Sequence, residues 1–315
     1  MSRIPFIDRS VRLAITIVGF PLSICQTMLS YYHIYKNKPT GKHVRVSQRT
    51  LHAVVTGENT QGNPTIILES GMGGCSLDWS LIQPELSKNS MVLSYDRAGF
   101  GWSTKTMVQP TCKNYVSELR LLLKEMNLKP PYILVGHSYG GMITRLFANE
   151  YPEEVKGLIL VDSTHEGRYL TNIMSEMRRT EREVNLKMFR LGYLLSPIGL
   201  PRMLKRHIGA NRLPSDVQKI LTSLGRRNNA FKAAYLELLC AEESALQLKN
   251  APPLRHDLPV IVLSAGKQND DWKKGQEELL NLTKRTKQIM VEDSWHSIQI
   301  HRPDVVVDAV KSLLS

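Results

Sequence analysis

Cysteine is scarce in this 315-residue chain, and its four copies stand apart from one another. No C-x-x-C pair and no spacing typical of metal ligands occurs, so the sequence predicts neither a disulfide framework nor a zinc site. The chain also lacks internal repeats, low-complexity tracts and a glycine-rich nucleotide fingerprint. We therefore expect a domain that uses no metal and no cofactor. The four cysteines are Cys25, Cys75, Cys112 and Cys240.

Acidic residues are fewer than basic ones. The chain has 29 Asp and Glu against 41 Lys and Arg, and residues 163–257 alone hold 16 Lys and Arg against 9 Asp and Glu. Basic pairs in this segment, such as Arg178-Arg179 and Lys205-Arg206, are typical either of a solvated helix face or of a surface for anionic lipid headgroups. The sequence leaves both open. No recognition module for nucleic acid accompanies the charge, so nucleic-acid binding is not expected.

The most informative motif that is present is a G-x-S-x-G sequence. Gly136, Ser138 and Gly140 follow the apolar run 132–135 and precede a helical pattern over 141–151. Glycines two residues on either side of a serine allow the sharp strand-to-helix turn that exposes its hydroxyl group. The following helix directs its N-terminal N–H groups to the place where negative charge develops. The pattern predicts a nucleophile elbow with Ser138 at its tip.

Two further glycine-bearing loops follow predicted strands. The apolar run 65–68 leads into a loop over 69–74 that is suited to exposing backbone donors, and the run 91–95 leads into a polar loop over 96–103. A helical pattern over 114–127 precedes the strand at Tyr132, and residues 154–160 lead into Val161 and Asp162. This alternation predicts an α/β fold with a mostly parallel sheet. Functional sites in such sheets lie at the carboxyl ends of the strands, where all of these loops fall.

These motifs, in this order, resemble those of the α/β-hydrolase family, and specifically its bacterial single-domain serine hydrolases of the AB hydrolase-1 type. The resemblance runs roughly from Val44 to the C-terminus. It rests on the E-S-G-x-G-G loop at 69–74, the Y-D-R-A-G-x-G-W-S loop at 95–103, the elbow and the sequence Ser294-Trp295-His296. It implies the α/β-hydrolase fold, with a mostly parallel central sheet, helices on both faces and a helical cap inserted after the sixth strand.

The segment between the sixth and seventh predicted strands is too long to be a loop. It shows helical patterns near residues 169–194, 214–224 and 229–248. By the resemblance this segment is the cap, which covers the site and shapes the substrate pocket. We expect the hydrolase core in residues 44–162 and 258–315 and the cap in residues 163–257.

The resemblance assigns roles to individual residues. Ser138 would be the nucleophile and His296 the general base that takes its proton and later returns it to the leaving group. The backbone N–H groups of Met72 and Tyr139 would form the oxyanion hole. Family members more often have Gly than Trp before the histidine, so Trp295 suggests a bulky wall near the base.

The acid that completes the triad stays open. Many family members carry it in the loop after the seventh strand, where this chain has Asn269 at the expected position, followed by Asp270 and Asp271. A neutral amide cannot stabilise an imidazolium as a carboxylate does, so Asp270 or Asp271 would have to substitute. The other known place is the end of the sixth strand, where Asp162 lies. We favour Asp162 and keep Asp270 and Asp271 as alternatives.

The serine limits the chemistry. Family members that open epoxides or displace halide use an aspartate as the alkylated nucleophile, which Ser138 cannot replace. The resemblance therefore implies acyl transfer to water, with a carboxylic ester, thioester or lactone as substrate, either a small molecule or lipid-like. The alternative is a catalytically silent protein of this fold that acts as a membrane-bound ligand-binding or signalling module.

The N-terminus predicts membrane association. Residues 13–32 form a mostly apolar stretch of 20 residues without charge, which is long enough to cross a hydrocarbon core. We expect a single uncleaved anchor within residues 1–35, and basic residues on both sides of the stretch leave its orientation undetermined. Two alternatives stay open: a signal that is cleaved and leaves a secreted or lipid-anchored protein, and a helix packed on the hydrolase body.

Overall fold

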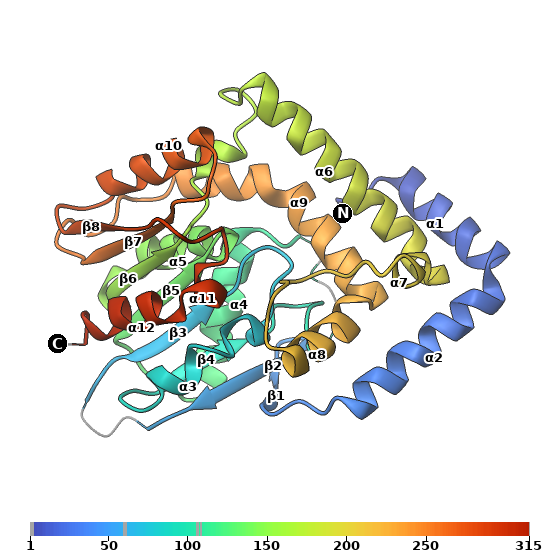
Figure 1. The fold of residues 1–315 in the computed structure, drawn as a ribbon, viewed down its shortest axis with the longest axis horizontal. Helices are drawn as coiled ribbons and strands as arrows, with labels where there is room; N and C mark the ends of the chain where they lie inside the picture. The colour runs from blue at the N-terminus through green and yellow to red at the C-terminus, as the bar shows by residue number, and fades with distance from the viewer. Residues whose placement is uncertain (1–2, 59–61, 105–106, 108, 315) are drawn as a thin grey trace.

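A mostly parallel β-sheet is the centre of the fold (Figure 1). The computed structural model describes residues 3–58, 62–104, 107 and 109–314. These form an eight-stranded sheet in the order β1-β2-β4-β3-β5-β6-β7-β8. The pairs β1–β2 and β2–β4 are antiparallel, and every pair from β4–β3 through to β7–β8 is parallel. The strands are β1 Lys42–Val46, β2 Arg49–Thr56, β3 Thr65–Glu69, β4 Val92–Tyr95, β5 Tyr132–His137, β6 Val155–Val161, β7 Val260–Ala265 and β8 Thr286–Val291.

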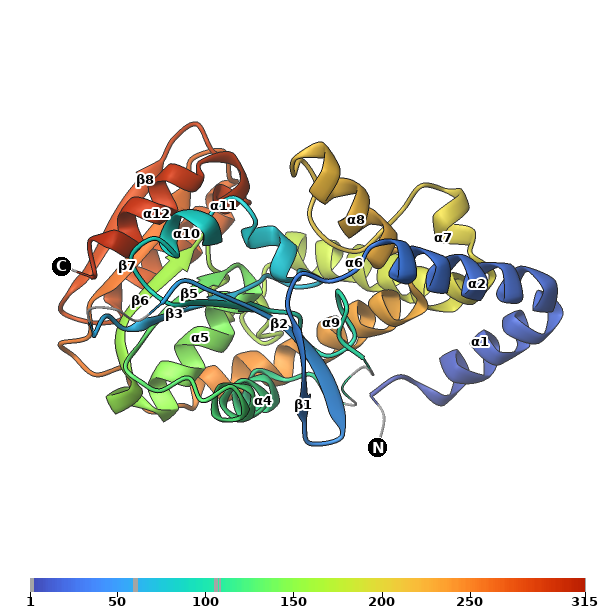
Figure 2. The same ribbon diagram turned by 90° about the horizontal axis from the view of Figure 1, so that it is seen from below.

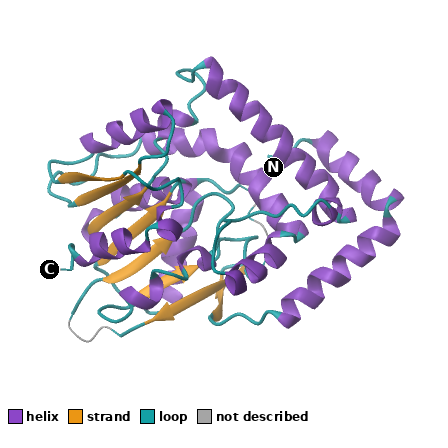
Figure 3. Cartoon of the chain, in the orientation of Figure 1, coloured by secondary structure: helices purple, strands orange, loops and turns teal. Residues whose placement is uncertain are grey.

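Helices cover both faces of this sheet (Figures 2 and 3). One hydrophobic cluster joins the sheet to α4, α5 and α9, and a second joins its other face to α11 and α12. The strands β3, β4, β5 and β7 are buried along their whole length, as expected for parallel strands packed on both sides. The α/β class predicted from the alternation of strands and helices is confirmed. The helices outside the next two segments are α3 Gln83–Leu86, α4 Cys112–Glu125, α5 Tyr139–Glu150, α10 Asp270–Glu278, α11 Ile298–His301 and α12 Pro303–Lys311.

Four helices occupy the chain between β6 and β7. They are α6 Glu176–Leu195, α7 Leu200–Met203, α8 Ser215–Gly225 and α9 Asn228–Lys249. The helix α9 reaches the loops at the carboxyl ends of β3 and β4, since Glu237 accepts a hydrogen bond from Gly73 N at 3.0 Å and from Arg97 Nε at 3.0 Å. The segment expected to be a cap is therefore helical and lies against the edge of the sheet where the functional loops meet.

The N-terminal segment forms two helices rather than one. The sequence predicts a single apolar span over 13–32, whereas α1 ends at Val18 and α2 runs from Phe20 to Lys36 (Figure 2). A Cβ atom on Gly19 would lie 2.4 Å from Ile198 Cγ2, and Pro21 sits in the first turn of α2, where its missing N–H costs nothing. Within the described residues no single helix has the length and apolarity to cross a membrane, although α1 and α2 meet those criteria as a pair bent by 95°.

Candidate active site

The serine of the G-x-S-x-G motif sits on a strained turn. Ser138 lies between the last residue of β5 and the first residue of α5, with φ 51° and ψ −121°. A non-glycine residue with positive φ is unusual and persists only where the surroundings hold it. The flanking glycines permit the turn: a Cβ atom on Gly140 would lie 2.4 Å from the carbonyl oxygen of Glu69, and one on Gly136 would lie 2.4 Å from Thr144 Oγ1.

Three residues far apart in the sequence form a chain of hydrogen bonds. Ser138 Oγ lies 2.9 Å from His296 Nε2, and His296 Nδ1 lies 2.7 Å from Asp162 Oδ2. The carboxylate of Asp162 is fully buried, while the side chain of His296 is 38% exposed. A hydroxyl, an imidazole and a carboxylate in this order can pass a proton from the serine to the histidine and stabilise the resulting imidazolium.

Asp162 is held by the neighbouring strand β7 and by the loop that follows it. It follows β6 directly, and its Oδ1 atom accepts a hydrogen bond from Ala265 N at 3.1 Å. The side-chain amide of Gln268 donates to Oδ2 at 2.5 Å and lies 3.2 Å from His296 Nδ1. The sequence does not predict Gln268 as part of the site, because nothing in its local pattern shows that its side chain reaches the end of the neighbouring strand β6.

The loop after β7 uses its polar residues differently. Asn269 is the N-cap of α10, and its Oδ1 atom accepts a hydrogen bond from Trp272 N at 2.9 Å. Asp271 forms an ion pair with Arg178 of α6, and Asp270 is an exposed residue in the first turn of α10. Among the described residues, the carboxylate against His296 Nδ1 is therefore that of Asp162.

The predicted oxyanion residues are at the start of α5 and in the loop after β3. Tyr139 is the first residue of α5, so its N–H group belongs to the first turn, where donors have no acceptor within the helix. Met72 lies in the loop after β3, between Gly71, whose carbonyl oxygen accepts from Arg97 Nη2 at 2.6 Å, and Gly73, whose N–H donates to Glu237. The loop that carries Met72 is thus fixed on both sides.

A buried cluster of ion pairs supports this loop. Arg97 bonds to Glu69 at 2.6 Å and to Glu237 of α9 at 3.0 Å, and all three side chains are at most 1% exposed. Burial alone would lower the pKa of Arg97, but the charges of Glu237 and then Glu69 outweigh it and hold that pKa well above its ordinary value. Glu69 and Arg97 belong to the two loop motifs, but no local pattern pairs them, because they follow different strands. Glu237 lies 140 positions from Arg97, and nothing in the sequence connects it with these loops.

Two aromatic rings enclose the base. The imidazole of His137 lies 4.8 Å from that of His296 between ring centres, and its Nε2 atom lies 3.0 Å from the backbone oxygen of His296. Burial, followed by the proximity of His296, lowers the pKa of His137 well below its ordinary value, which disfavours a positive charge next to the base. The second ring is that of Trp272, edge-on to His296 at 4.8 Å.

The bulky wall that the sequence assigned to Trp295 comes from Trp272 instead. The Trp295 ring stacks on His301 at 4.0 Å and lies beneath the guanidinium group of Arg212 at 4.3 Å. The sequence position next to the base is therefore not the position that shapes its surroundings.

A cavity of about 300 Å³ opens beside Ser138 and His296. A smaller cavity of about 150 Å³ shares three of its lining residues, Arg168, Tyr169 and Glu181. Arg168 pairs with Glu181 at 2.9 Å and lies over the Trp272 ring at 4.9 Å. The helix α6 and the turn before it therefore form one wall of the site.

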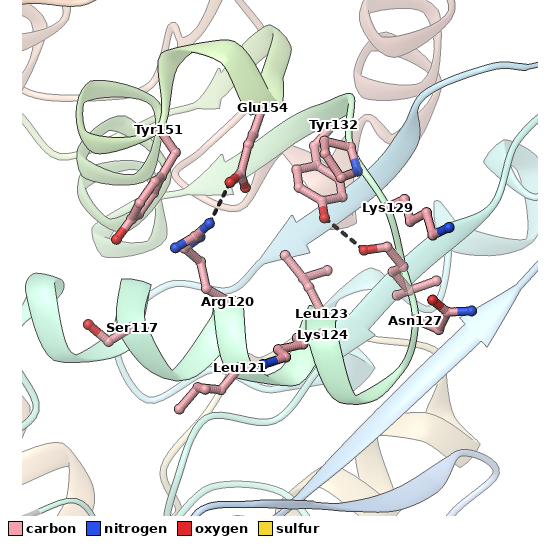
Figure 4. A pocket seen from close by; sticks show the side chains of 12 residues that line it. Ser117, Arg120, Leu121, Leu123, Lys124, Asn127, Lys129, Tyr132, Tyr151 and Glu154 are labelled. Atoms are coloured by element: carbon pink, nitrogen blue, oxygen red, sulfur yellow. Dashed lines mark hydrogen bonds and ion pairs between the residues drawn. The ribbon is translucent and has the colours of Figure 1, made fainter.

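A larger cavity of about 730 Å³ lies elsewhere, against α4 and the beginning of β5 (Figure 4). Its residues include Arg120, which forms an ion pair with Glu154, and Tyr132, the first residue of β5. Ser138 follows the last residue of that strand, so the two cavities belong to opposite ends of β5. Size alone does not identify the site.

Comparisons with known proteins agree on the fold. A family model described as "alpha/beta hydrolase fold" matches residues 64–303. The uncharacterized protein YqjL of Bacillus subtilis is 30% identical over 209 residues, which are 63% of this chain and 80% of YqjL.

Two solved structures have the same architecture. The epoxide hydrolase CorEH, without ligand, has a TM-score of 0.71 and 17% identity, over 87% of this chain and 98% of its own. A putative lipase from Acinetobacter baumannii has a TM-score of 0.66 and 21% identity, over 92% of this chain and 95% of its own. At these identities the likeness shows the fold and leaves the substrate open.

Proposed function

This chain belongs to the alpha/beta hydrolase fold family, and we propose that it is a serine hydrolase that cleaves a carboxylic ester, a thioester or a lactone. The observation that carries the proposal is the line of contacts from Ser138 Oγ to His296 Nε2 at 2.9 Å and from His296 Nδ1 to Asp162 Oδ2 at 2.7 Å. Nucleophile, base and orienting acid are within hydrogen-bond reach of one another, as acyl transfer requires.

The chemistry follows from these positions. His296 Nε2 takes the hydroxyl proton while Ser138 Oγ bonds to the carbonyl carbon, and the N–H groups of Tyr139 and Met72 stabilise the oxyanion. The imidazolium then gives its proton to the departing alcohol or thiol as the bond to the carbonyl carbon breaks. A water molecule repeats the sequence on the acyl-enzyme, and its attack releases the acid and restores Ser138.

The serine nucleophile also argues against epoxide hydrolysis, the activity named for one structural relative. CorEH is an epoxide hydrolase, and family members with that activity attack through a carboxylate. The elbow of this chain offers a hydroxyl group. The putative lipase from Acinetobacter baumannii is a structural relative whose named activity agrees with ester cleavage.

Turnover of nitrophenyl esters of increasing acyl length by the full chain tests the proposal, with an aryl epoxide and a bromoalkane as comparison substrates. We expect ester hydrolysis, no epoxide or halide turnover, and a loss of at least about a thousandfold in kcat for Ser138→Ala and for His296→Ala. Ser297→Ala, a change near the histidine, is the matched control and should stay within a few fold of the parent. Near-normal ester turnover by the Ser138 variant would contradict the proposal.

A further inference from the structure

The two N-terminal helices bury several polar residues and expose most of their apolar ones. In α1, Asp8 is 2% exposed, and its carboxylate accepts hydrogen bonds from Arg190 Nε and Tyr235 OH, both at 2.8 Å. In α2, Gln26 is also 2% exposed; it donates to the carbonyl oxygen of Arg226 at 2.8 Å and accepts from Arg202 Nε at 2.8 Å. A helix on a water-exposed surface has the opposite arrangement.

These polar contacts belong to one stripe along the helices. Residues 8, 12, 16, 19, 23, 26, 30 and 33 are polar or glycine, recur at helical spacing and are all buried or half-buried. Arg12 lies 4.4 Å from the centre of the Tyr193 ring and donates to Ser196 Oγ at 3.1 Å. The stripe therefore fastens α1 and α2 to α6, α8 and α9, and it fixes which side of each helix points outward.

The outward side is apolar, and we call it the hairpin face. Its members range from 43% exposed at Leu29 to 88% at Val18. Single exposed apolar side chains are ordinary, whereas this many on one pair of helices mark a surface that meets something apolar. The hairpin face consists of Phe6, Ile7, Leu13, Ile17, Val18, Phe20, Leu22, Ile24, Met28, Leu29, Tyr31, Tyr32 and Tyr35.

Positive charge borders the hairpin face. Residues 1–46 contain seven Lys and Arg and a single acid, Asp8, which is buried. Arg9 on α1 and Lys36 and Lys38 at the end of α2 are exposed. Three tyrosines of the face lie just before Lys36, and tyrosine next to lysine is typical of the boundary between acyl chains and headgroups.

A second apolar and basic segment adjoins α2. Arg202, which donates to Gln26, is followed by Met203 and Leu204, which are 68% and 63% exposed. Lys205 and Arg206 come next and are exposed. The pattern of the hairpin face, with apolar side chains flanked by bases and without an exposed acid, is repeated here.

We propose that α1 and α2 lie in the plane of an anionic phospholipid bilayer, with the hairpin face among the upper acyl chains and the bordering bases at the headgroups. Apolar area supplies the binding and positive charge selects anionic lipid. Figures 1 and 2 place both helices at the end of the molecule opposite β8, with no other element over their outward side. This geometry differs from a single transmembrane helix, because the buried polar stripe keeps α1 and α2 packed against the cap helices.

The helix α6 connects this surface with the candidate active site. Arg190 and Tyr193, near its C-terminal end, contact α1, and Glu181, near its N-terminal end, lines the cavity beside Ser138. A bilayer bound at the hairpin face therefore holds the helix that walls the site. The binding itself does not depend on catalysis, so the tests below use no enzymatic readout.

Flotation of the full chain with lipid vesicles tests the surface. We expect co-flotation with vesicles of phosphatidylcholine and phosphatidylglycerol and weaker binding to phosphatidylcholine alone. Replacing Leu13, Ile17 and Val18 together by Gln should weaken binding by at least about tenfold, with thermal unfolding unchanged because these side chains are exposed. The matched control replaces Leu121, Ile289 and Met290, which are 43%, 39% and 40% exposed on the hydrolase core, and should float as the parent does.

Two further experiments test the role of the basic residues and the depth of the helices in the bilayer. Arg9→Gln, Lys36→Gln and Lys38→Gln should each weaken binding to anionic vesicles about fivefold. Cys25 is exposed while the other three cysteines are buried, so a fluorophore on Cys25 reports depth. Quenching should be strongest by a nitroxide placed near the lipid ester linkage. Strongest quenching from the bilayer centre would overturn the in-plane geometry in favour of a span. The proposed membrane-binding surface would be wrong if the parent chain did not float. It would also be wrong if the control variant on the hydrolase core lost as much vesicle binding as the variant on the hairpin face.

Discussion

At the scale of single residues, the site rests on two backbone conformations that few side chains adopt. Ser138 and Asp162 have φ values of 51° and 40°, and both follow the last residue of a parallel strand. Hydrogen bonds hold them there: Ser138 N donates to the carbonyl oxygen of Val161 at 3.1 Å, and Asp162 N donates to that of Leu263 at 2.7 Å. The neighbouring strands thus fix both residues in place, which is what a preorganised site requires.

Three substitutions test whether Asp162 is the acid of the triad. Asp162→Asn should lower kcat by about 10⁴-fold, because an amide cannot stabilise the imidazolium of His296 and favours the wrong tautomer. Asp271→Asn should cost far less, since Asp271 pairs with Arg178. Asp270→Asn, at an exposed position, is the matched control. Steady-state ester hydrolysis measures all three, and a greater loss in either of the last two variants would move the acid to α10.

A second residue-scale prediction concerns stability. Asp78 is 3% exposed, and its Oδ1 atom has no hydrogen-bond partner among the described residues. Burial, opposed by the hydrogen bond from Cys75 N, raises the pKa of Asp78 from 3.8 to about 7. The folded chain therefore binds this proton more tightly than the unfolded chain does, and the contribution of Asp78 to the free energy of unfolding falls as pH rises from 3.8 towards 7.

We expect Asp78→Asn to remove this decrease in the free energy of unfolding with rising pH. At about pH 8 the variant should be more stable than the parent by roughly 2–4 kcal/mol, and below about pH 4 the difference should vanish or reverse. Urea unfolding across this range measures it. The control is Asp257→Asn, whose carboxylate is 57% exposed beside Arg255. A difference in free energy of unfolding between parent and Asp78→Asn that is the same at every pH would show that protonation of Asp78 does not cause the pH dependence.

At the scale of elements, local patterns predicted which segments are helices and strands, and long-range contacts decided the rest. The predicted helices at 214–224 and 229–248 differ from α8 and α9 by one residue at each end. The helix predicted from residue 169 begins at Glu176, because Ser175 caps it by accepting a hydrogen bond from Arg178 N. Pro21 is a local signal for the break between α1 and α2, whereas the close packing of Gly19 on Ile198 is a long-range contact that no local pattern contains.

The cap helix α9 positions the loop that carries Met72, and this can be tested at Glu237. Its carboxylate accepts from Gly73 N, Arg97 Nε and Tyr115 OH. Glu237→Gln leaves Arg97 with one carboxylate partner and cannot satisfy all three donors. We expect kcat to fall by about tenfold or more with little change in KM, and the free energy of unfolding to fall by about 2–4 kcal/mol.

The matched control lies on the same helix. Glu243 pairs with Arg3 at the surface, so Glu243→Gln should change neither kcat nor stability by a measurable amount. A Glu237 variant with raised KM and unchanged kcat would place this residue in substrate binding rather than in support of the loop.

At the scale of the whole molecule, buried polar contacts and one small apolar cluster join the N-terminal helices to the rest of the chain. Ile4 packs with Tyr193 and Tyr235, but most apolar residues of α1 and α2 face outward. The local stability of these helices therefore depends on single hydrogen bonds, among them the buried one from Tyr235 OH to Asp8. Such elements open separately from the core when these bonds are lost.

Asp8→Ala should therefore release the N-terminal helices without unfolding the body. It leaves Arg190 and Tyr235 without their partner, and we expect tryptic cleavage at Arg9, Arg12 and Lys36 to become about tenfold faster or more. Turnover of a short, soluble ester should stay within about twofold. Asp293→Ala, at a surface pair with Arg302, is the control. Equal proteolysis of parent and variant would show that the apolar contacts alone hold the hairpin.

Reaction of the full chain with a fluorophosphonate, measured by intact-protein mass spectrometry, tests most directly whether Ser138 is an activated nucleophile. Only a serine hydroxyl activated by a neighbouring base reacts, because the adduct resembles the tetrahedral intermediate of acyl transfer. We expect one adduct per chain at Ser138, none in Ser138→Ala and a greatly slowed reaction in His296→Ala. A folded parent chain that stays unlabelled, or labelling that persists in Ser138→Ala, would contradict this role of Ser138 and favour a catalytically silent member of the fold.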